Sequence, residues 1–248
     1  MFIPSFFYRI GKMDLQQIQT ALTGKSIQES LQVLTSVFPG QVSFSSSLSH
    51  EDQVLTDIVF KNALPVNIFT IDTGRLFNEV YELIQVTEAK YQQRLQVYFP
   101  KTENVESLIT EHGINCFYQS TDLRKKCCHT RKVEPLQRAL KDVKVWVTGL
   151  RSGQSDSRSA VQLLEWDNAL QRIKYNPLAN WSIDEILVYV KEFNVPVNPM
   201  YNNGYPSIGC APCTRAIFPG EDIRAGRWWW ESSKKECGLH EQTINYQI

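Results

Sequence analysis

Short apolar runs alternate with amphipathic stretches along the first three-fifths of the chain. Runs rich in β-branched and aromatic residues predict strands at 41–45, 66–71, 95–99 and 143–148. Between the first two runs, residues 51–63 place Val54, Leu55, Ile58 and Val59 at helical spacing. Alternation of strands and helices is typical of a parallel sheet covered by helices. The pattern therefore predicts an α/β fold.

Three further stretches predict helices. Apolar residues at helical spacing mark one after the second strand and one directly after a pair of cysteines: Phe77, Val80, Tyr81 and Ile84, then Val133, Leu136 and Leu140. Ser182 and Glu185 form a capping box that opens a third, continuing to Phe193. Beyond Val195, prolines and glycines indicate irregular structure. We expect one structural unit, with an α/β domain over 1–195 and a functional C-terminal segment over 196–248.

Composition limits the class of protein. The 248 residues are 42% hydrophobic and 21% charged with no net charge, so the whole chain has no electrostatic bias toward nucleic acid or membranes. The apolar N-terminus is too short and interrupted for a signal peptide, and no run reaches transmembrane length. Six cysteines in such a chain favour metal binding or thiol chemistry in a reducing compartment. We expect a cytoplasmic enzyme.

Four cysteines form two pairs that suit one metal centre. Cys127 and Cys128 are adjacent, and Cys210 and Cys213 form a C-x-x-C motif. Adjacent residues point apart in regular structure, so ligation by the first pair requires a special backbone. Each pair alone also suits a buried or redox dithiol, but both together predict a four-thiolate site. Ligand type does not separate zinc from [4Fe–4S].

Two cysteines remain outside these pairs. Cys237 follows lysines at 234 and 235 and precedes His240, and nearby positive charge favours a reactive thiolate. An inert tail cysteine is the alternative for that residue. Cys116 lies in an apolar context and is expected to be structural. The pattern predicts four ligands and one nucleophile.

Polar loops and arginines suggest an anion site. The loop after the first strand contains Ser45, Ser46 and Ser47, which suit a phosphate at a helix N-terminus, although helix capping is an alternative. Basic residues cluster near both cysteine pairs and after the fourth strand: Arg124, Lys125, Lys126, Arg131, Lys132, Arg151, Arg158, Arg224 and Arg227. Lys125 and Lys126 are expected to be solvated. Arg224 and Arg227 are expected to bind an anion, with Trp228-Trp229-Trp230 as packing anchors.

Taken together, these segments resemble the assimilatory adenylyl-sulfate (APS) reductases, the iron–sulfur branch of the APS/PAPS reductase family. The match runs from about residue 40 to 240. Its carriers are Ile71–Arg75, Cys127-Cys128 with Arg131–Pro135, Thr148–Arg151, Tyr205–Arg215, Gly226–Glu231 and Glu236-Cys237-Gly238-Leu239-His240.

The resemblance implies an adenine-nucleotide α-hydrolase-like (Rossmann-like) fold with a [4Fe–4S] cluster on Cys127, Cys128, Cys210 and Cys213. It implies that Cys237 attacks the sulfur of APS, releases AMP and becomes S-sulfocysteine. Thioredoxin, or glutaredoxin, then liberates sulfite for cysteine biosynthesis. It also implies that Lys132, Arg224, Arg227 and His240 surround the phosphosulfate, while Arg158 and the serine-rich loop contact the nucleotide. The tail with Cys237 is expected to move, and the resemblance is compatible with a homo-oligomer.

The sequence departs from the family pattern in two places. It also leaves two other functions open. The serine loop lacks the glycines of related pyrophosphatase loops, and Ser152 stands where a second basic residue is usual. A PAPS reductase, or an enzyme accepting both nucleotides, is the nearest alternative. A non-catalytic nucleotide-binding module with structural zinc is the more distant one.

Overall fold

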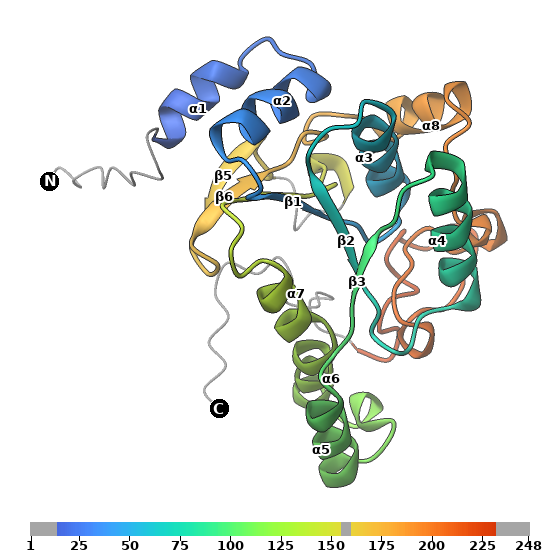
Figure 1. Cartoon of the computed structure of the whole chain (residues 1–248). Coiled ribbons are helices and arrows are strands. Elements are labelled where there is room, and N and C mark those ends of the chain that lie inside the picture. The colour runs from blue at the N-terminus through green and yellow to red at the C-terminus, as the bar shows by residue number, and fades with distance from the viewer. Residues whose placement is uncertain (1–13, 155–159, 232–248) are drawn as a thin grey trace, which may run out of the picture.

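A six-stranded sheet forms the centre of the protein in the computed structural model, which describes residues 14–154 and 160–231 (Figure 1). The strands are β1 (Val42–Ser45), β2 (Asn67–Ile71), β3 (Gln96–Tyr98), β4 (Val145–Val147), β5 (Leu164–Asp167) and β6 (Arg172–Tyr175). Their order is β3-β2-β1-β4-β6-β5. All neighbours are parallel except β5, which pairs antiparallel with β6. The α/β prediction is confirmed, and the expectation of a wholly parallel sheet is corrected at one edge.

Helices cover both faces of this sheet. The α-helices are α1 (Leu15–Leu22), α2 (Ile27–Val37), α3 (His50–Lys61), α4 (Asn78–Tyr91), α5 (Thr102–His112), α6 (Thr121–Cys128), α7 (Glu134–Ala139) and α8 (Ile183–Glu192). Figure 1 shows α3, α4 and α8 together on one side, while α7 packs against β2 and β3. The helices α5 and α6 extend beyond the sheet, below it in this view. The largest apolar core lies between the sheet, α2 and α3.

The four predicted strands occur within one or two residues of their expected bounds. Each run supplies buried apolar residues, such as Phe44 and Phe69, to the sheet interior. The helix expected after the cysteine pair is confirmed as α7, but the helical stretch begins earlier, because α6 contains the pair and a π-helix (His129–Val133) joins it to α7. Residues 164–175 form a strand pair that the sequence pattern did not predict.

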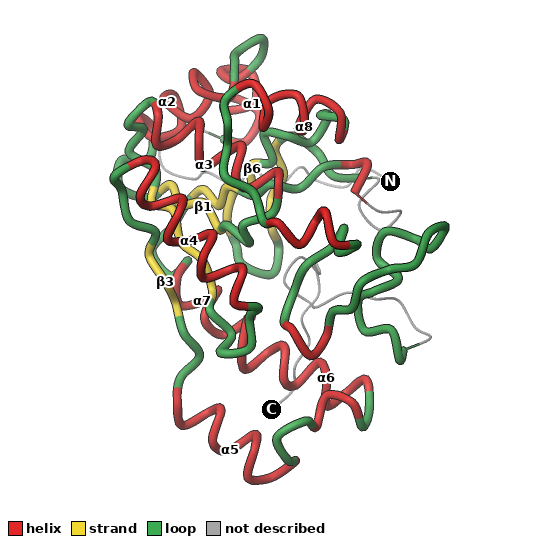
Figure 2. The backbone as a smooth tube through the Cα atoms, turned by 90° about the vertical axis from the view of Figure 1, so that its right-hand side faces the viewer, coloured by secondary structure: helices red, strands yellow, loops and turns green. Residues whose placement is uncertain are grey.

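The described part of the C-terminal segment is irregular, as expected. It contains two short 3₁₀ helices, Pro199–Asn203 and Ala211–Cys213, and one isolated bridge between Thr214 and Arg227. Two more 3₁₀ helices, Cys116–Tyr118 and Ser152–Gln154, lie in connections. In Figure 2 the long loops of this segment lie beside α4 and α6. The segment therefore packs on the domain that carries the first cysteine pair.

Candidate active site

The strand order identifies where a ligand binds. The chain leaves β1 toward β2 and β3 on one side and returns to β4 on the other, so the order reverses between β1 and β4. In open α/β sheets, ligands bind outside the carboxyl ends of the strands at such a switch point. The serine-rich loop follows β1, and Thr148–Arg151 follow β4. The serine-rich loop and the loop after β4 thus lie at the same edge of the sheet.

The serine-rich loop is shaped by its own hydrogen bonds. The backbone N–H and the hydroxyl of Ser47 both donate to Asp52 Oδ2 at 2.6 Å. The Ser46 hydroxyl accepts from the Leu48 N–H at 3.1 Å, and the Ser45 hydroxyl accepts from Trp146 Nε1 at 2.7 Å. Ser49 caps α3, so the alternative of helix capping holds for that residue. These bonds fix the loop with Ser47 exposed and Ser45 half-buried.

Two buried acidic residues support this loop from α3. Glu51 accepts from Arg151 Nε at 2.9 Å, which joins the start of α3 to the loop after β4. Burial raises the pKa of Glu51, but hydrogen bonds from Gln154 and Arg151 outweigh it and keep that pKa below its ordinary value. Burial raises the pKa of Asp52 to about 6, although the bonds from Ser47 oppose the rise. Ser152, the residue that departs from the family pattern, donates its hydroxyl to Ala179 O.

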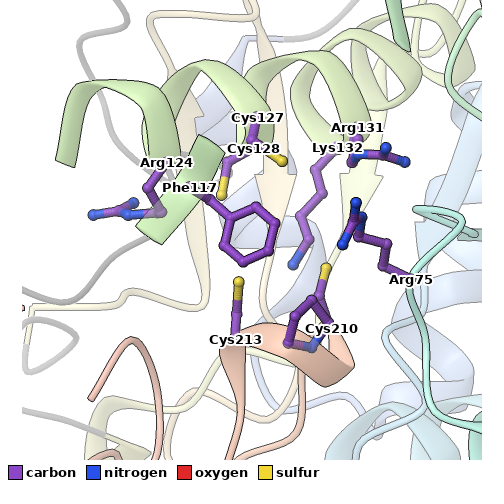
Figure 3. A pocket seen from close by; sticks show the side chains of 10 residues that line it. Arg75, Phe117, Arg124, Cys127, Cys128, Arg131, Lys132, Cys210 and Cys213 are labelled. Carbon is purple, nitrogen blue, oxygen red and sulfur yellow. The ribbon is translucent and has the colours of Figure 1, made fainter. Parts of the chain in front are cut away.

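The first cysteine pair lies at a change of helix type. Cys127 and Cys128 are the last two residues of α6, and the π-helix begins directly after them. π-helical turns are rare in proteins, and those that occur often lie at functional sites. Here the wider turn carries Arg131 and Lys132 on the same continuous helix as the cysteines, as Figure 3 shows. The pair therefore lies directly beside an irregular turn of the helix.

The second cysteine pair lies on a loop tied to the end of β2. The Ala211 N–H donates to Arg75 O at 2.8 Å, and Cys210 Sγ lies 3.3 Å from Thr73 Oγ1. Arg131 Nη1, from the π-helix, donates to Thr73 O at 2.7 Å. The turn after β2 is therefore the shared support of both cysteine-bearing segments.

All four predicted ligands line one pocket (Figure 3). Its other lining residues are mainly cationic: Arg75, Phe117, Arg124, Arg131, Lys132 and Pro212. The Lys132 side chain points from the helix toward Cys210 and Cys213. Across residues 14–154 and 160–231, no three His, Cys, Asp or Glu side chains are grouped closely enough to hold a metal ion. The pocket thus combines four buried thiols with positive charge, without the tight grouping of a single-ion site.

The cations change the acidity of the thiols unequally. Burial raises the pKa of Cys210, but Lys132, the Thr73 hydroxyl, Arg227 and Arg131 outweigh it and lower that pKa below its ordinary value. Burial and the neighbouring Cys210 raise the pKa of Cys213 to about 12. Cys127 has its pKa raised by burial, against the effect of Arg131. The positive charge therefore favours a thiolate first at Cys210.

Arg227 is placed beside the second cysteine pair. Its guanidinium donates to Ile208 O at 3.2 Å and lies 4.7 Å from the centre of the Trp228 ring. A Cβ on Gly209 would lie 2.2 Å from Arg227 Nη2, so only glycine leaves room for this arrangement. Trp228 is fully buried, as expected for a packing anchor. Arg224 is half-buried on the preceding turn.

The remaining predicted residues have different outcomes. Arg158, Cys237 and His240 lie outside the described residues. Cys116 is buried among apolar side chains, as expected, and Lys126 is exposed. The fold also brings to the site or its supports several residues for which the sequence predicted no role: Thr73, Arg75, Phe117, Glu51, Asp52 and Glu231. Arg75, Thr73 and Glu231 were at least in segments that carry the family resemblance, although no role was predicted for any of them.

Comparison with known families agrees with this fold and site. The model of the phosphoadenosine phosphosulfate reductase domain matches residues 41–216, and the chain belongs to this family. The match covers the serine-rich loop, both cysteine pairs and the edge where β1 and β4 end.

Individual relatives of the chain have a more specific name than the family does. In Burkholderia cepacia, a protein named adenosine 5'-phosphosulfate reductase is 51% identical to this chain over 205 residues, which cover 82% of each chain. In Allochromatium vinosum the identity is 50%, over 80% of this chain and 78% of the relative. A solved phosphoadenylyl-sulfate reductase from Candida auris, in complex with phosphate, is similar at a TM-score of 0.70 and 30% identity, covering 84% of this chain and 98% of that one. None of the described helices is long and apolar enough to cross a membrane.

Proposed function

We propose that this protein reduces adenosine 5'-phosphosulfate to sulfite and AMP. The observation that carries the proposal is the convergence of four buried cysteines and several cations in one pocket, next to the switch-point edge of the sheet. The relatives at about half identity over four-fifths of the chain bear the name of this activity.

The four cysteines suit a [4Fe–4S] cluster as the resident cofactor. The donor set is all sulfur, and Cys127, Cys128, Cys210 and Cys213 surround one pocket. Ligand type alone does not separate the cluster from a tetrahedral zinc. The resemblance to the iron–sulfur branch of the APS/PAPS reductases favours the cluster. When bound, the cluster would supply a local charge centre and a link between α6 and the loop that carries Cys210 and Cys213.

The phosphosulfate is proposed to lie between the strand ends and the cysteine pocket. Ser45, Ser46 and Ser47, with Arg158, are assigned to the nucleotide. Lys132, Arg224, Arg227 and His240 are assigned to the phosphosulfate oxygens, which guanidinium and ammonium groups bind well. Support comes from Lys132, which faces the pocket, and from Arg227, which is held in place beside it. Preplaced cations stabilise the negative charge that grows on the leaving AMP phosphate.

Cys237 is proposed as the nucleophile. Its thiolate attacks the sulfonyl sulfur, the bond from sulfur to the AMP phosphate oxygen breaks, and AMP leaves. The resulting S-sulfocysteine is cleaved by a thiol of thioredoxin or glutaredoxin, which releases sulfite and forms a mixed disulfide. The second thiol of that partner then reduces the disulfide and restores Cys237. We place this cycle in the cytoplasm, where thiols are kept reduced.

A comparison of substrates tests the proposal. Initial rates of sulfite release are measured with APS and with PAPS in the presence of thioredoxin. We expect kcat/KM to be higher for APS. A Cys237→Ser variant is expected to release no sulfite from either. A marked preference for PAPS would contradict the choice of substrate, and sulfite release by Cys237→Ser would contradict the nucleophile.

The zinc-module alternative has a separate test. Protein prepared without oxygen is expected to contain iron and inorganic sulfide and to absorb broadly near about 400 nm. A colourless protein with one zinc per chain and no sulfite release would support the module instead.

A further inference from the structure

A buried ion pair joins α6 to the end of the described C-terminal segment. Arg124 Nε and Nη2 donate to the two carboxylate oxygens of Glu231, each at 2.9 Å. The Arg124 side chain is 0% exposed and that of Glu231 is 4% exposed. Charges removed from water to this degree are costly unless each satisfies the other, so the two-point geometry is tightly specified.

Both ends of the pair lie next to cysteine ligands. Arg124 precedes Cys127 and Cys128 by three and four positions on α6, which places all three on neighbouring turns of one face. Its guanidinium also lies 4.7 Å from the centre of the Trp228 ring. The Trp228 N–H donates to Cys213 O at 3.1 Å, and the Glu231 N–H donates to Trp228 O at 2.9 Å. The turn from Trp228 to Glu231 is thus attached to both cysteine-bearing segments.

We propose that Arg124 and Glu231 are positioning residues that fix the start of the nucleophile segment at the cysteine pocket. This inference rests on the proposed function, in which Cys237 attacks APS. Cys237 follows Glu231 by six positions, and six residues span at most about 20 Å when fully extended. Holding Glu231 against α6 therefore limits the distance between the thiol and Glu231 to about 20 Å. Confinement of a reacting group lowers the entropic part of the barrier.

A second ion pair in the same segment provides a matched control. Arg215 Nη1 and Nη2 donate to the two carboxylate oxygens of Glu221 at 2.8 Å, so this pair is also bidentate, although Arg124 uses Nε and Nη2. Both of its side chains are 30% exposed, and solvated pairs contribute little. Glu221→Gln therefore removes a similar pair without leaving a buried cation unbalanced, whereas Glu231→Gln does leave one.

The experiment compares Glu231→Gln, Glu221→Gln and wild type as full-length, iron-loaded proteins. The single-turnover rate of sulfonate transfer from APS to Cys237 is expected to fall about tenfold to a hundredfold in Glu231→Gln. KM for APS is expected to match wild type, because the nucleotide edge is untouched, and each transfer rate is expressed per iron bound, because Arg124 lines the cysteine pocket. Alkylation of Cys237 by a maleimide, followed by mass spectrometry without substrate, is expected to be faster in this variant. Glu221→Gln is expected to match wild type in every measurement.

Equal transfer rates in Glu231→Gln and Glu221→Gln would overturn the inference. A rate that falls only in proportion to iron content would also overturn it, since the pair would then act through the cluster site alone. Arg124→Lys keeps the positive charge but replaces the planar guanidinium fork with an ammonium group, and is expected to slow transfer as well. If wild type forms no sulfonate adduct, the proposed function fails, and not the positioning role alone.

Discussion

The position of Arg227 depends on the absence of a side chain at Gly209. A Cβ there would lie 2.2 Å from Nη2 and 2.5 Å from Cζ of Arg227, which is buried and cannot move aside freely. We expect Gly209→Ala to raise KM for APS about tenfold, equivalent to about 1.4 kcal/mol of binding. Gly220→Ala is the control for backbone strain: its φ is +87°, which strains an alanine, but its Cβ meets no atom within 4 Å, so KM for APS is expected to stay unchanged. An unchanged KM in Gly209→Ala would argue against Arg227 as a substrate ligand.

Asp52 gives the serine-rich loop a pH-dependent support. Its pKa is raised by burial from 3.8 to about 6, so the folded protein binds a proton more tightly than the unfolded chain does. Its contribution to stability is therefore present below about pH 4 and is lost as the pH rises through about 6. A shift of about two units corresponds to about 3 kcal/mol at most.

Urea unfolding of wild type and Asp52→Asn at several pH values tests this. The free energy of unfolding of wild type, minus that of the variant, is expected to fall between about pH 4 and pH 7. A difference that stays constant or rises would contradict the raised pKa.

The roles of single residues were predictable where the residues that act together lie close to one another in the sequence. Cys210 and Cys213 show their role through spacing, and Arg131 and Lys132 through proximity to Cys128 along the chain. Glu231 and Arg124 are 107 positions apart, and no local pattern shows that one neutralises the other. The buried pair of Glu51 and Arg151 was missed for the same reason.

At the scale of elements, one carboxylate joins three helices on one face of the sheet. Asp57 on α3 accepts hydrogen bonds from Tyr91 Oη of α4 at 2.6 Å and Tyr189 Oη of α8 at 2.8 Å. We expect Tyr189→Phe to lower the free energy of unfolding by about 1 kcal/mol, because one hydrogen bond is lost. Asp57→Ala is expected to cost about 1–3 kcal/mol, because two half-buried tyrosine hydroxyls lose their acceptor.

Denaturant titration with iron content as a control measures this effect. Iron content is expected to stay at the wild-type value, because Asp57 is remote from the cysteine pocket. A Tyr189→Phe variant as stable as wild type would contradict the coupling of α8 to α3.

Strands and helices were predictable where their side chains are buried on one face or on both faces. β1 and β2 combine apolar residues such as Phe44 and Phe69 with uncharged polar ones, whereas Leu164–Asp167 and Arg172–Tyr175 mix charged with apolar residues, and β5 forms an edge of the sheet. The helices α1 and α2 were not predicted, although the capping boxes at Asp14 and Ser26 are local signals for both. The π-helix had no sequence signal beyond the requirement that adjacent cysteines face one centre.

At the scale of the whole molecule, the C-terminal segment depends on links to the cysteine pocket. Among the described residues it has no strand in the sheet, and its ties include Ala211 to Arg75 and the hydrogen bond from Tyr118 Oη to Pro212 O at 2.6 Å. We expect removal of iron by a chelator to expose residues 196–231 to trypsin before the sheet is cut. Peptide mass mapping over time measures the order of cleavage, and early cleavage between β1 and β4 would contradict it.

The central claim is that Cys237 carries the sulfonate between APS and the reductant. Intact-mass analysis of iron-loaded protein mixed with APS, in the absence of thioredoxin, tests it most directly. We predict one added sulfonate per chain, located on Cys237 by peptide mapping, absent from Cys237→Ser and lost when reduced thioredoxin is added. Sulfite release with no adduct on Cys237, or an adduct on another cysteine, would contradict the claim.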